Sequence, residues 1–301
     1  MPANFFSPYS ARMSLKDSAR RPGVLRTLLS PAIGVRRSWN DMKMRSGRDV
    51  LDRLESLAVS DVTVRVDEYG GAFSFGPRSH LLRRILETGS YEPDLAELFS
   101  SLIRPDRDVI DVGANVGLFS ILAARKLGTG KLLAAEPTDG AFGRLAANVE
   151  ANGLAGKVIM YKGLVAQSDS MALLNVVPGR EEYSSMAGLV HPSAVGEVAE
   201  TQSIQTRSID SLVAEHGLRP ALMKVDVEGA EGMVFEGAEK TLKEHRPVVL
   251  SEFSRPLLRK NGSSPEKIVA LFERCGYEVR NPFQGTKPGA VDFDEIIATP
   301  V

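Results

Sequence analysis

Apolar runs and polar breaks alternate along most of the chain after residue 60. Short apolar runs typical of strands are followed by longer segments in which apolar residues recur every three or four positions, as they do in helices. The predicted strands are residues 108–112, 131–137, 157–163, 222–229 and 247–253, with two more at 277–281 and 295–300. The predicted helices are residues 116–128, 139–153, 208–217, 228–245 and 264–276. This alternation predicts an α/β fold with a mostly parallel sheet and helices on both faces.

The segment before this alternation has a different pattern. Residues 62–66 and 72–76 alternate polar and apolar positions around the turn "DEYGG", which predicts a β-hairpin. Two helices are predicted at 80–89 and 92–103. We therefore divide the chain into an N-terminal arm (1–58, partly helical or disordered), a hairpin and short-helix lead-in (59–90) and a main domain (91–301).

Composition and charge narrow the function classes. Apolar residues make up 43% and charged residues 25%, as in an ordinary globular protein, and the net charge is −1. Residues 1–50 carry ten basic and three acidic residues, so this basic arm has a charge of +7 and the rest of the chain −8. A solvated tail is the favoured interpretation of the arm, and peripheral contact with an anionic membrane or RNA is the alternative.

Targeting and redox signals are weak. The single cysteine, Cys275, excludes an intrachain disulfide and fits a reducing compartment. No apolar run approaches the ~18–20 residues that span a bilayer, and the N-terminus has no secretory pattern. A cytoplasmic location is expected.

The stretch "DVIDVGANVGLFS", residues 108–120, contains the most informative turn. A dinucleotide fingerprint G-x-G-x-x-G starting at Gly113 would need glycine where Asn115 and Leu118 stand. The pattern that remains is Asp111-x-Gly113-x-Asn115-x-Gly117. It suits S-adenosylmethionine (SAM), because small residues let the amino acid part of SAM approach the backbone and a carboxylate favours its cationic groups.

The next predicted strand ends in Glu136, 25 positions after Asp111. An acid at this position can accept hydrogen bonds from both ribose hydroxyls of a nucleoside. Folds that bind NAD also place an acid at this position. The structural alternative is that Glu136 only neighbours the N-cap of the helix that follows. Beside the glycine pattern, ribose binding is favoured.

The stretch "LMKVDVEGAE" carries the candidate chemistry. The period of a strand places Lys224, Asp226 and Glu228 on one side. Asp226 is the leading candidate for a general base, and Lys224 would orient it or the substrate oxygen. Alternatively, Asp226, Glu228 and Glu252 would hold Mg²⁺, which polarises a hydroxyl. Glu231 is interpreted as a helix cap.

The motifs "VIDVGANVGLFS", "AAEP", "RSIDSL", "LMKVDVEGAEGMVFEGA" and "VVLSEF", with "YEP" at 91–93, resemble the FkbM-type SAM-dependent methyltransferases over about residues 91–253. The resemblance implies a class I methyltransferase (Rossmann-like) sandwich with a seven-stranded sheet whose last strand is antiparallel. It also implies methyl transfer to hydroxyls of sugars, polyketides and other natural products.

The sequence therefore predicts a SAM-dependent O-methyltransferase acting on a sugar, glycan or other small-molecule acceptor. An RNA methyltransferase that uses the basic arm is the second hypothesis, and the acidic catalytic stretch speaks against nucleic acid. A binding protein that kept the SAM fold without catalysis is the third, but its expected loss of glycines or acids is not seen. Weaker candidates are Ser184 and Ser185 as cleft residues, His191 as an auxiliary base and Asp210 as a helix N-cap.

Overall fold

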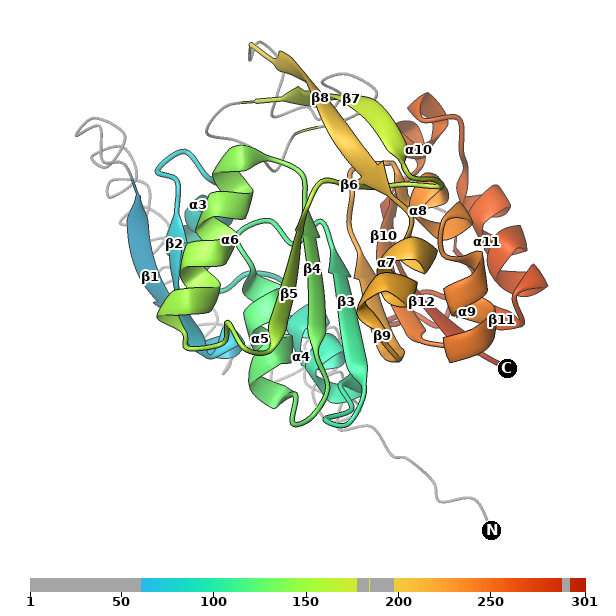
Figure 1. Cartoon of the computed structure of the whole chain (residues 1–301), viewed down its shortest axis with the longest axis horizontal. Helices are drawn as coiled ribbons and strands as arrows, with labels where there is room; N and C mark the ends of the chain where they lie inside the picture. The colour runs from blue at the N-terminus through green and yellow to red at the C-terminus, as the bar shows by residue number, and fades with distance from the viewer. Residues whose placement is uncertain (1–60, 178–183, 185–197, 289–292) are drawn as a thin grey trace, which may run out of the picture.

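The computed structural model describes residues 61–177, 184, 198–288 and 293–301. A seven-stranded sheet forms its centre (Figure 1). The strand order is β11 (Tyr277–Arg280), β12 (Phe293–Pro300), β10 (Val248–Ser254), β9 (Pro220–Val225), β3 (Asp108–Val112), β4 (Leu132–Glu136) and β5 (Val158–Lys162). Strands β10, β9, β3, β4 and β5 are parallel, whereas β12 is antiparallel to both of its neighbours. The mostly parallel seven-stranded sheet with an antiparallel last strand is thus confirmed.

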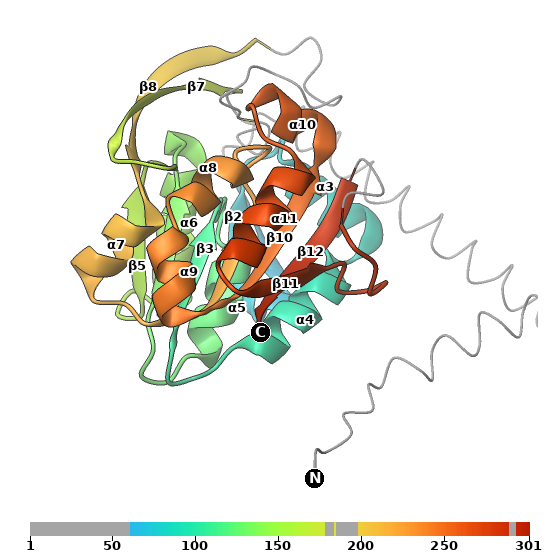
Figure 2. The ribbon, with the colours of Figure 1, turned by 90° about the vertical axis from the view of Figure 1, so that its right-hand side faces the viewer.

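Successive residues of each central strand point to opposite faces and enter two separate cores. Val109 and Leu222 pack in one hydrophobic cluster, and their neighbours Ile110 and Met223 pack in the other. The first face is covered by α3 (His80–Thr88), α4 (Pro93–Leu102), α5 (Leu118–Lys126) and α6 (Asp139–Ala151). The second is covered by α7 (Ile209–His216), α8 (Glu231–Glu236), α9 (Glu239–His245), α10 (Arg255–Lys260) and α11 (Pro265–Arg274). Figure 2 shows the helices on the two sides of the sheet.

The predicted hairpin consists of β1 (Val62–Val66) and β2 (Gly71–Phe75), joined by the short 3-10 helix η1 (Asp67–Tyr69). It packs into the first core through fully buried aromatic side chains, Tyr69 and Phe73 among them. Asn148 and Asn152 of α6 form hydrogen bonds through their amide groups with the backbone of β2. Asn148 also donates to the carbonyl of Val116, 2.9 Å away. One side chain therefore couples the hairpin to the glycine turn after β3.

A three-stranded sheet lies beyond the carboxyl ends of the central strands, as Figures 1 and 2 show from two sides. It contains β6 (Leu164–Val165), β8 (Glu200–Arg207) and β7 (Ser170–Val176), in that order, with β7 antiparallel to β8. The hydrophobic pattern did not predict these strands. Their outer positions are exposed and several are polar, so no regular alternation marks them.

The single helix predicted over residues 228–245 is wrong in one respect, because α8 and α9 are separate helices. The chain bends at Gly237, where an added Cβ would lie only 2.2 Å from the carbonyl oxygen of Ala166. Glycine is required there because the loop after β6 packs directly against the helix end. This is a tertiary contact that no local pattern records.

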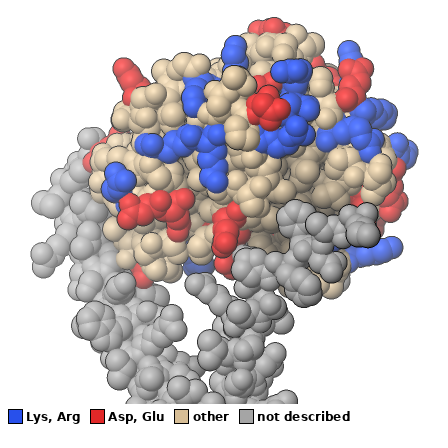
Figure 3. All heavy atoms as spheres, turned by 90° about the horizontal axis from the view of Figure 1, so that it is seen from below, with Lys and Arg blue, Asp and Glu red and all other residues tan. Residues whose placement is uncertain are grey.

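The end of the molecule opposite the three-stranded sheet carries a band of Lys and Arg side chains, interspersed with acids (Figure 3). Two basic side chains make contacts near the strand ends: Arg107, before β3, donates to the carbonyl of Arg219, before β9, at 2.9 Å, and Arg246, before β10, donates to Val301 O, after β12, at 2.6 Å. No helix within the described residues has the length and apolar character needed to cross a lipid bilayer.

Candidate functional site

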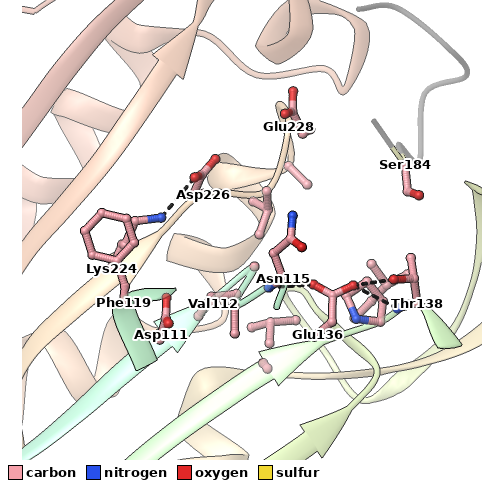
Figure 4. A pocket seen from close by; sticks show the side chains of 18 of the residues that line it. Asp111, Val112, Asn115, Phe119, Glu136, Thr138, Ser184, Lys224, Asp226 and Glu228 are labelled. Atoms are coloured by element: carbon pink, nitrogen blue, oxygen red, sulfur yellow. Dashed lines mark hydrogen bonds and ion pairs between the residues drawn. The ribbon is translucent and has the colours of Figure 1, made fainter. Parts of the chain in front are cut away.

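A cavity lies at the carboxyl ends of β3, β4 and β9, where a doubly wound sheet places its ligands. It is also lined by Leu164 and Val165 of β6 and by Leu174 of β7, so the three-stranded sheet closes part of it. Eight candidate residues line this cavity: Asp111, Gly113, Asn115, Glu136, Lys224, Asp226, Glu228 and Ser184. Gly117 does not belong to the described lining. Figure 4 shows how the labelled side chains surround it.

The glycine turn after β3 owes its shape to positive φ angles, +80° at Gly113, +51° at Asn115 and +93° at Gly117. The left-handed region is tolerated by glycine and, among other residues, best by asparagine and aspartate. A Cβ added at Gly113 would lie 1.8 Å from the carbonyl oxygen of Asp226, and one at Gly117 would lie 2.7 Å from Leu145 Cδ1. These two glycines are therefore required by packing within the protein, before any ligand is considered.

The Asp111 carboxylate is buried at the base of this turn. Its Oδ2 accepts a 2.6 Å hydrogen bond from Ser120 Oγ, whereas its buried Oδ1 has no hydrogen-bond partner in the described part of the protein. Burial raises the pKa of Asp111, while Lys224 and the Ser120 hydroxyl act to lower it. A buried acceptor without a donor is costly, and a cationic donor in the cavity would satisfy it.

Glu136 ends β4 and supports the same turn. Its Oε2 accepts the Asn115 N–H at 3.0 Å, and its Oε1 accepts both the backbone N–H and the hydroxyl of Thr138, at 3.0 and 2.6 Å. The carboxylate thus supports both the glycine turn and the residue before α6 while lining the cavity. The ribose-binding interpretation of Glu136 is compatible with these contacts and stays a prediction.

Lys224 and Asp226 form an ion pair on the other side of the cavity (Figure 4), with 2.9 Å between Nζ and Oδ2. The Lys224 side chain is only 6% exposed, and its ammonium lies 4.6 Å from the ring centre of Phe119. Burial alone would lower the pKa of Lys224, but the charges of Asp226, Asp111 and Glu92 outweigh burial and raise it. Lys224 is therefore a permanent cation at neutral pH and cannot act as a neutral base.

The three-carboxylate Mg²⁺ site is not assembled. Asp226 and Glu228 line the main cavity, and Glu252 lines a smaller neighbouring one, which Asp226 also borders. Among the residues that the structure describes, no three His, Cys, Asp or Glu side chains come together in a way that would hold a metal ion. Asp226 is instead paired with the Lys224 ammonium.

The smaller cavity lies against the Lys224–Asp226 pair and is lined by Glu92, Glu252 and Glu295. Glu252 and Glu295 are directly opposed on the antiparallel strands β10 and β12. Burial, followed by the charges of neighbouring acids, raises the pKa of Glu252 to about 7 and that of Glu295 to about 8. Sequence analysis singled out Glu252 but missed Glu295, because the placement of Glu295 depends on the register of the final strand.

The weaker candidates fall into three groups. Ser184 lines the cavity as predicted, and its buried hydroxyl has no partner among the described residues. Ser185 and His191 lie outside the described residues. Asp210 is not the N-cap of α7, because Ser208 has that role; Asp210 instead accepts the N–H groups of Lys240 and Thr241 and fixes the start of α9.

Glu231 has the structural role expected of it. It is 2% exposed, and its Oε1 accepts the N–H groups of Val227 and Gly229 at 3.2 and 3.1 Å. Burial raises the pKa of Glu231 to about 7, although these two bonds act to lower it. The carboxylate thus holds the turn that follows Asp226.

The model of the FkbM methyltransferase domain matches residues 111–279 of this sequence, which is more than half of the chain. The chain belongs to the FkbM methyltransferase family. It is 32% identical over 147 residues to Methyltransferase 1 of Beauveria bassiana, covering 44% of this chain and 59% of that protein. It is 28% identical over 195 residues to the methyltransferase sdnD of Sordaria araneosa, covering 57% of this chain and 73% of that protein.

Solved structures with a similar fold include an FkbM methyltransferase from Methylobacillus flagellatus, at 17% identity and a TM-score of 0.41, covering 72% of this chain and 52% of that one. Another is an O-methyltransferase from Bacillus cereus in complex with SAH, at 16% identity and a TM-score of 0.41, covering 70% and 83% of the two chains.

The residues of this FkbM domain fit SAM in two respects. The unpartnered Asp111 Oδ1 suits the ammonium group of the cofactor, and the Glu136 carboxylate lines the cavity beside the turn, as a ribose-binding acid would. Tyr91 and Glu92 were missed as site residues, although "YEP" marks them in the sequence. They lie just before α4. Only the tertiary fold brings Tyr91 to the main cavity and Glu92 to the smaller one.

Proposed function

We propose that this protein transfers a methyl group from SAM to a hydroxyl of a sugar, glycan or natural product. The observation that carries the proposal is the ion pair between the buried Lys224 and the partly exposed Asp226, which lines the same cavity as the unpartnered Asp111 oxygen. One side of the cavity offers anionic and backbone groups for a cationic nucleoside. The other offers a carboxylate beside a fixed cation, which suits an acceptor hydroxyl.

Five residues would hold SAM: Asp111, Gly113, Asn115, Gly117 and Glu136. Asp111 would face its amino acid part and Glu136 its ribose, and the glycines give the turn between them its shape. When bound, SAM supplies a methyl group on a positively charged sulfur that leaves readily.

Asp226 is the proposed general base. Its Oδ2 is engaged by Lys224, and a carboxylate can use its second oxygen to accept the proton of an acceptor hydroxyl. As the new oxygen–carbon bond forms and the carbon–sulfur bond breaks, the hydroxyl proton passes to Asp226. Lys224 would hold Asp226 in place and stabilise negative charge on the acceptor oxygen, while Phe119 supports its ammonium.

No step is assigned to Mg²⁺, because the residues expected to bind it do not gather around one point. We expect chelation by EDTA to leave methyl transfer unchanged.

The proposal is tested by incubating the protein with labelled SAM and a collection of glycosides, polyols, hydroxylated lipids and polyketides, with and without EDTA. Label should appear on a hydroxyl compound with wild type and be almost absent with Asp226→Asn. Transfer of label to RNA in preference to every small acceptor would instead support an RNA methyltransferase.

The basic arm, residues 1–50, is proposed to have no part in the chemistry, since no candidate catalytic residue lies in it. A protein that begins near residue 60 should fold and bind SAM with wild-type affinity, which calorimetry would measure. If it binds SAM but loses methyl transfer, the arm contributes to acceptor docking. If it does not fold, the arm belongs to the core.

A further inference from the structure

The family match begins at Asp111, yet part of the cavity wall comes from earlier in the chain. Leu81 of α3 and Tyr91 both line the main cavity, and Glu92 lines the smaller one. The segment between β2 and α4 is therefore part of the site.

Tyr91 is held in place by the hairpin. Its backbone N–H donates to Glu68 Oε1 at 2.7 Å, and its carbonyl accepts a 2.9 Å bond from the Tyr69 hydroxyl. The next residue, Glu92, has a φ of +45°, and Pro93 then starts α4. A glutamate pays about 1–2 kcal/mol for this left-handed conformation, so the surrounding contacts must impose it. The sharp bend separates the Tyr91 and Glu92 side chains between two cavities.

Tyr91 lies on the side of the cavity that holds the ion pair. The ring of Tyr69 packs edge-on against Phe119 with 5.3 Å between ring centres, and Phe119 in turn lies under the Lys224 ammonium. Tyr91 lines the same cavity as Lys224 and Asp226. Burial and the charges of Glu92 and Asp226 raise the pKa of Tyr91, so the phenol stays neutral.

We propose that Tyr91 is a specificity-determining residue whose ring forms the wall against which the acceptor lies while Asp226 takes its proton. The inference rests on the proposed function and adds the class of acceptor to it. The neutral Tyr91 ring offers a ligand an apolar face, and Leu81 and Leu174 are further apolar lining of the same cavity. Such a wall suits a hydroxyl carried by a ring with an apolar face, such as a pyranoside, better than an acyclic polyol.

Three variants separate the parts of this idea. Tyr91→Ala removes the wall, and Tyr91→Phe keeps the ring but removes the hydroxyl. Tyr161→Phe is the matched control, because the Tyr161 hydroxyl donates to Gln205 O at 3.2 Å and the residue is not part of the described cavity lining. SAM affinity is measured by calorimetry, and kcat and KM are measured with the best pyranoside from the labelled-SAM screen and with sorbitol.

We expect all three variants to bind SAM within threefold of wild type. Tyr91→Ala should lower kcat/KM for the pyranoside by about 10–100-fold, the range for losing apolar contact in a pocket, and should reduce the preference for pyranoside over sorbitol. Tyr91→Phe should lose less than tenfold, and Tyr161→Phe should match wild type.

Two results would overturn the inference. A tenfold or greater loss of SAM affinity in Tyr91→Ala would place Tyr91 at the cofactor. Unchanged kcat/KM and an unchanged pyranoside preference, with SAM binding intact, would remove it from the acceptor site. Failure of wild type to methylate any hydroxyl compound is a different result, because it defeats the proposed function and this inference together.

Discussion

Two turns meet at the centre of the site, one after β3 and one after β9, and they are built alike. Each has a non-glycine residue in the left-handed region, Asn115 at +51° and Glu228 at +52°, with a left-handed glycine close by. Each is also held by a glutamate from outside the turn, Glu136 for the first and Glu231 for the second. The same backbone device has therefore been used twice at adjacent strand ends.

The two turns differ in where their polar groups point. Glu136 lines the cavity, whereas Glu231 is buried and does not belong to the described lining. Conversely, the second turn follows Lys224 and Asp226, and the first is preceded only by Asp111. The comparison shows that the glycines determine how the two turns pack against each other. The carboxylates beside the turns determine which chemistry the site can perform.

The largest effect is expected at the second turn. Asp226→Asn keeps the shape of the side chain but removes the base, and turnover should fall by about 10²–10⁴-fold. SAM affinity, measured by calorimetry, should stay near wild type if the turns divide cofactor binding and chemistry between them. Turnover near wild type on the true acceptor would remove Asp226 from the chemistry.

The next largest effect is expected where the two turns pack against each other. Gly113→Ala places a Cβ 1.8 Å from the carbonyl oxygen of Asp226 and forces alanine to a φ of +80°, so the two turns must separate. We expect a loss of about 3 kcal/mol or more in the free energy of unfolding, together with loss of SAM binding. The control is Gly143→Ala within α6, where no atom lies within 4 Å of the added Cβ; it should stabilise by about 0.5–1 kcal/mol. Equal unfolding midpoints in denaturant for the two variants would show that the packing of the two turns against each other does not contribute to stability.

The paired glutamates provide a smaller, sharper test. Glu136→Gln removes the charge beside the cavity and should weaken SAM binding by about tenfold, because hydrogen bonds to a charged acceptor contribute about 1.5–3 kcal/mol. Glu231→Gln makes the same change at the other turn, where the carboxyl already has a pKa of about 7, and SAM affinity should be unchanged. Calorimetry on both variants would contradict the comparison if they lost affinity equally.

The sequence predicted the features that depend on local periodicity and on the residues at strand ends. Strand periodicity predicted that Lys224, Asp226 and Glu228 lie on one side, and all three line the same cavity. It did not predict the break at Gly237, which depends on an approach to Ala166. Nor did it predict that Glu295 lies opposite Glu252, because this depends on antiparallel register between strands far apart in sequence.

The three acids expected to hold Mg²⁺ show the same limit. Strand periodicity placed acids near one another but could not show that the Lys224 ammonium would lie 2.9 Å from Asp226. Tyr91 and Glu92 escaped notice because their position depends on the hairpin turn, through Glu68 and Tyr69. The features that the sequence could not predict are therefore those that depend on contacts between distant segments of the chain.

The smallest effect concerns the carboxyl pair behind the second turn. Glu252 and Glu295 have folded-state pKa values of about 7 and about 8, above the ordinary value of 4.5, so between about pH 4.5 and 8 the folded state binds more protons than the unfolded state. Stability should therefore be greatest near pH 5 and fall as the pH rises through this window, by at most ~1.4 kcal/mol per pH unit for each proton. Glu295→Gln removes one of these groups and should flatten the decline by about 0.5–1 kcal/mol per pH unit, measured by denaturant unfolding from pH 5 to 8. Glu278→Gln on the adjacent strand β11 is the control, because Glu278 is exposed, and it should follow wild type. If Glu295→Gln keeps the full pH dependence, the opposed carboxyls do not share the buried charge, and the decline must come from Glu231 in the second turn itself.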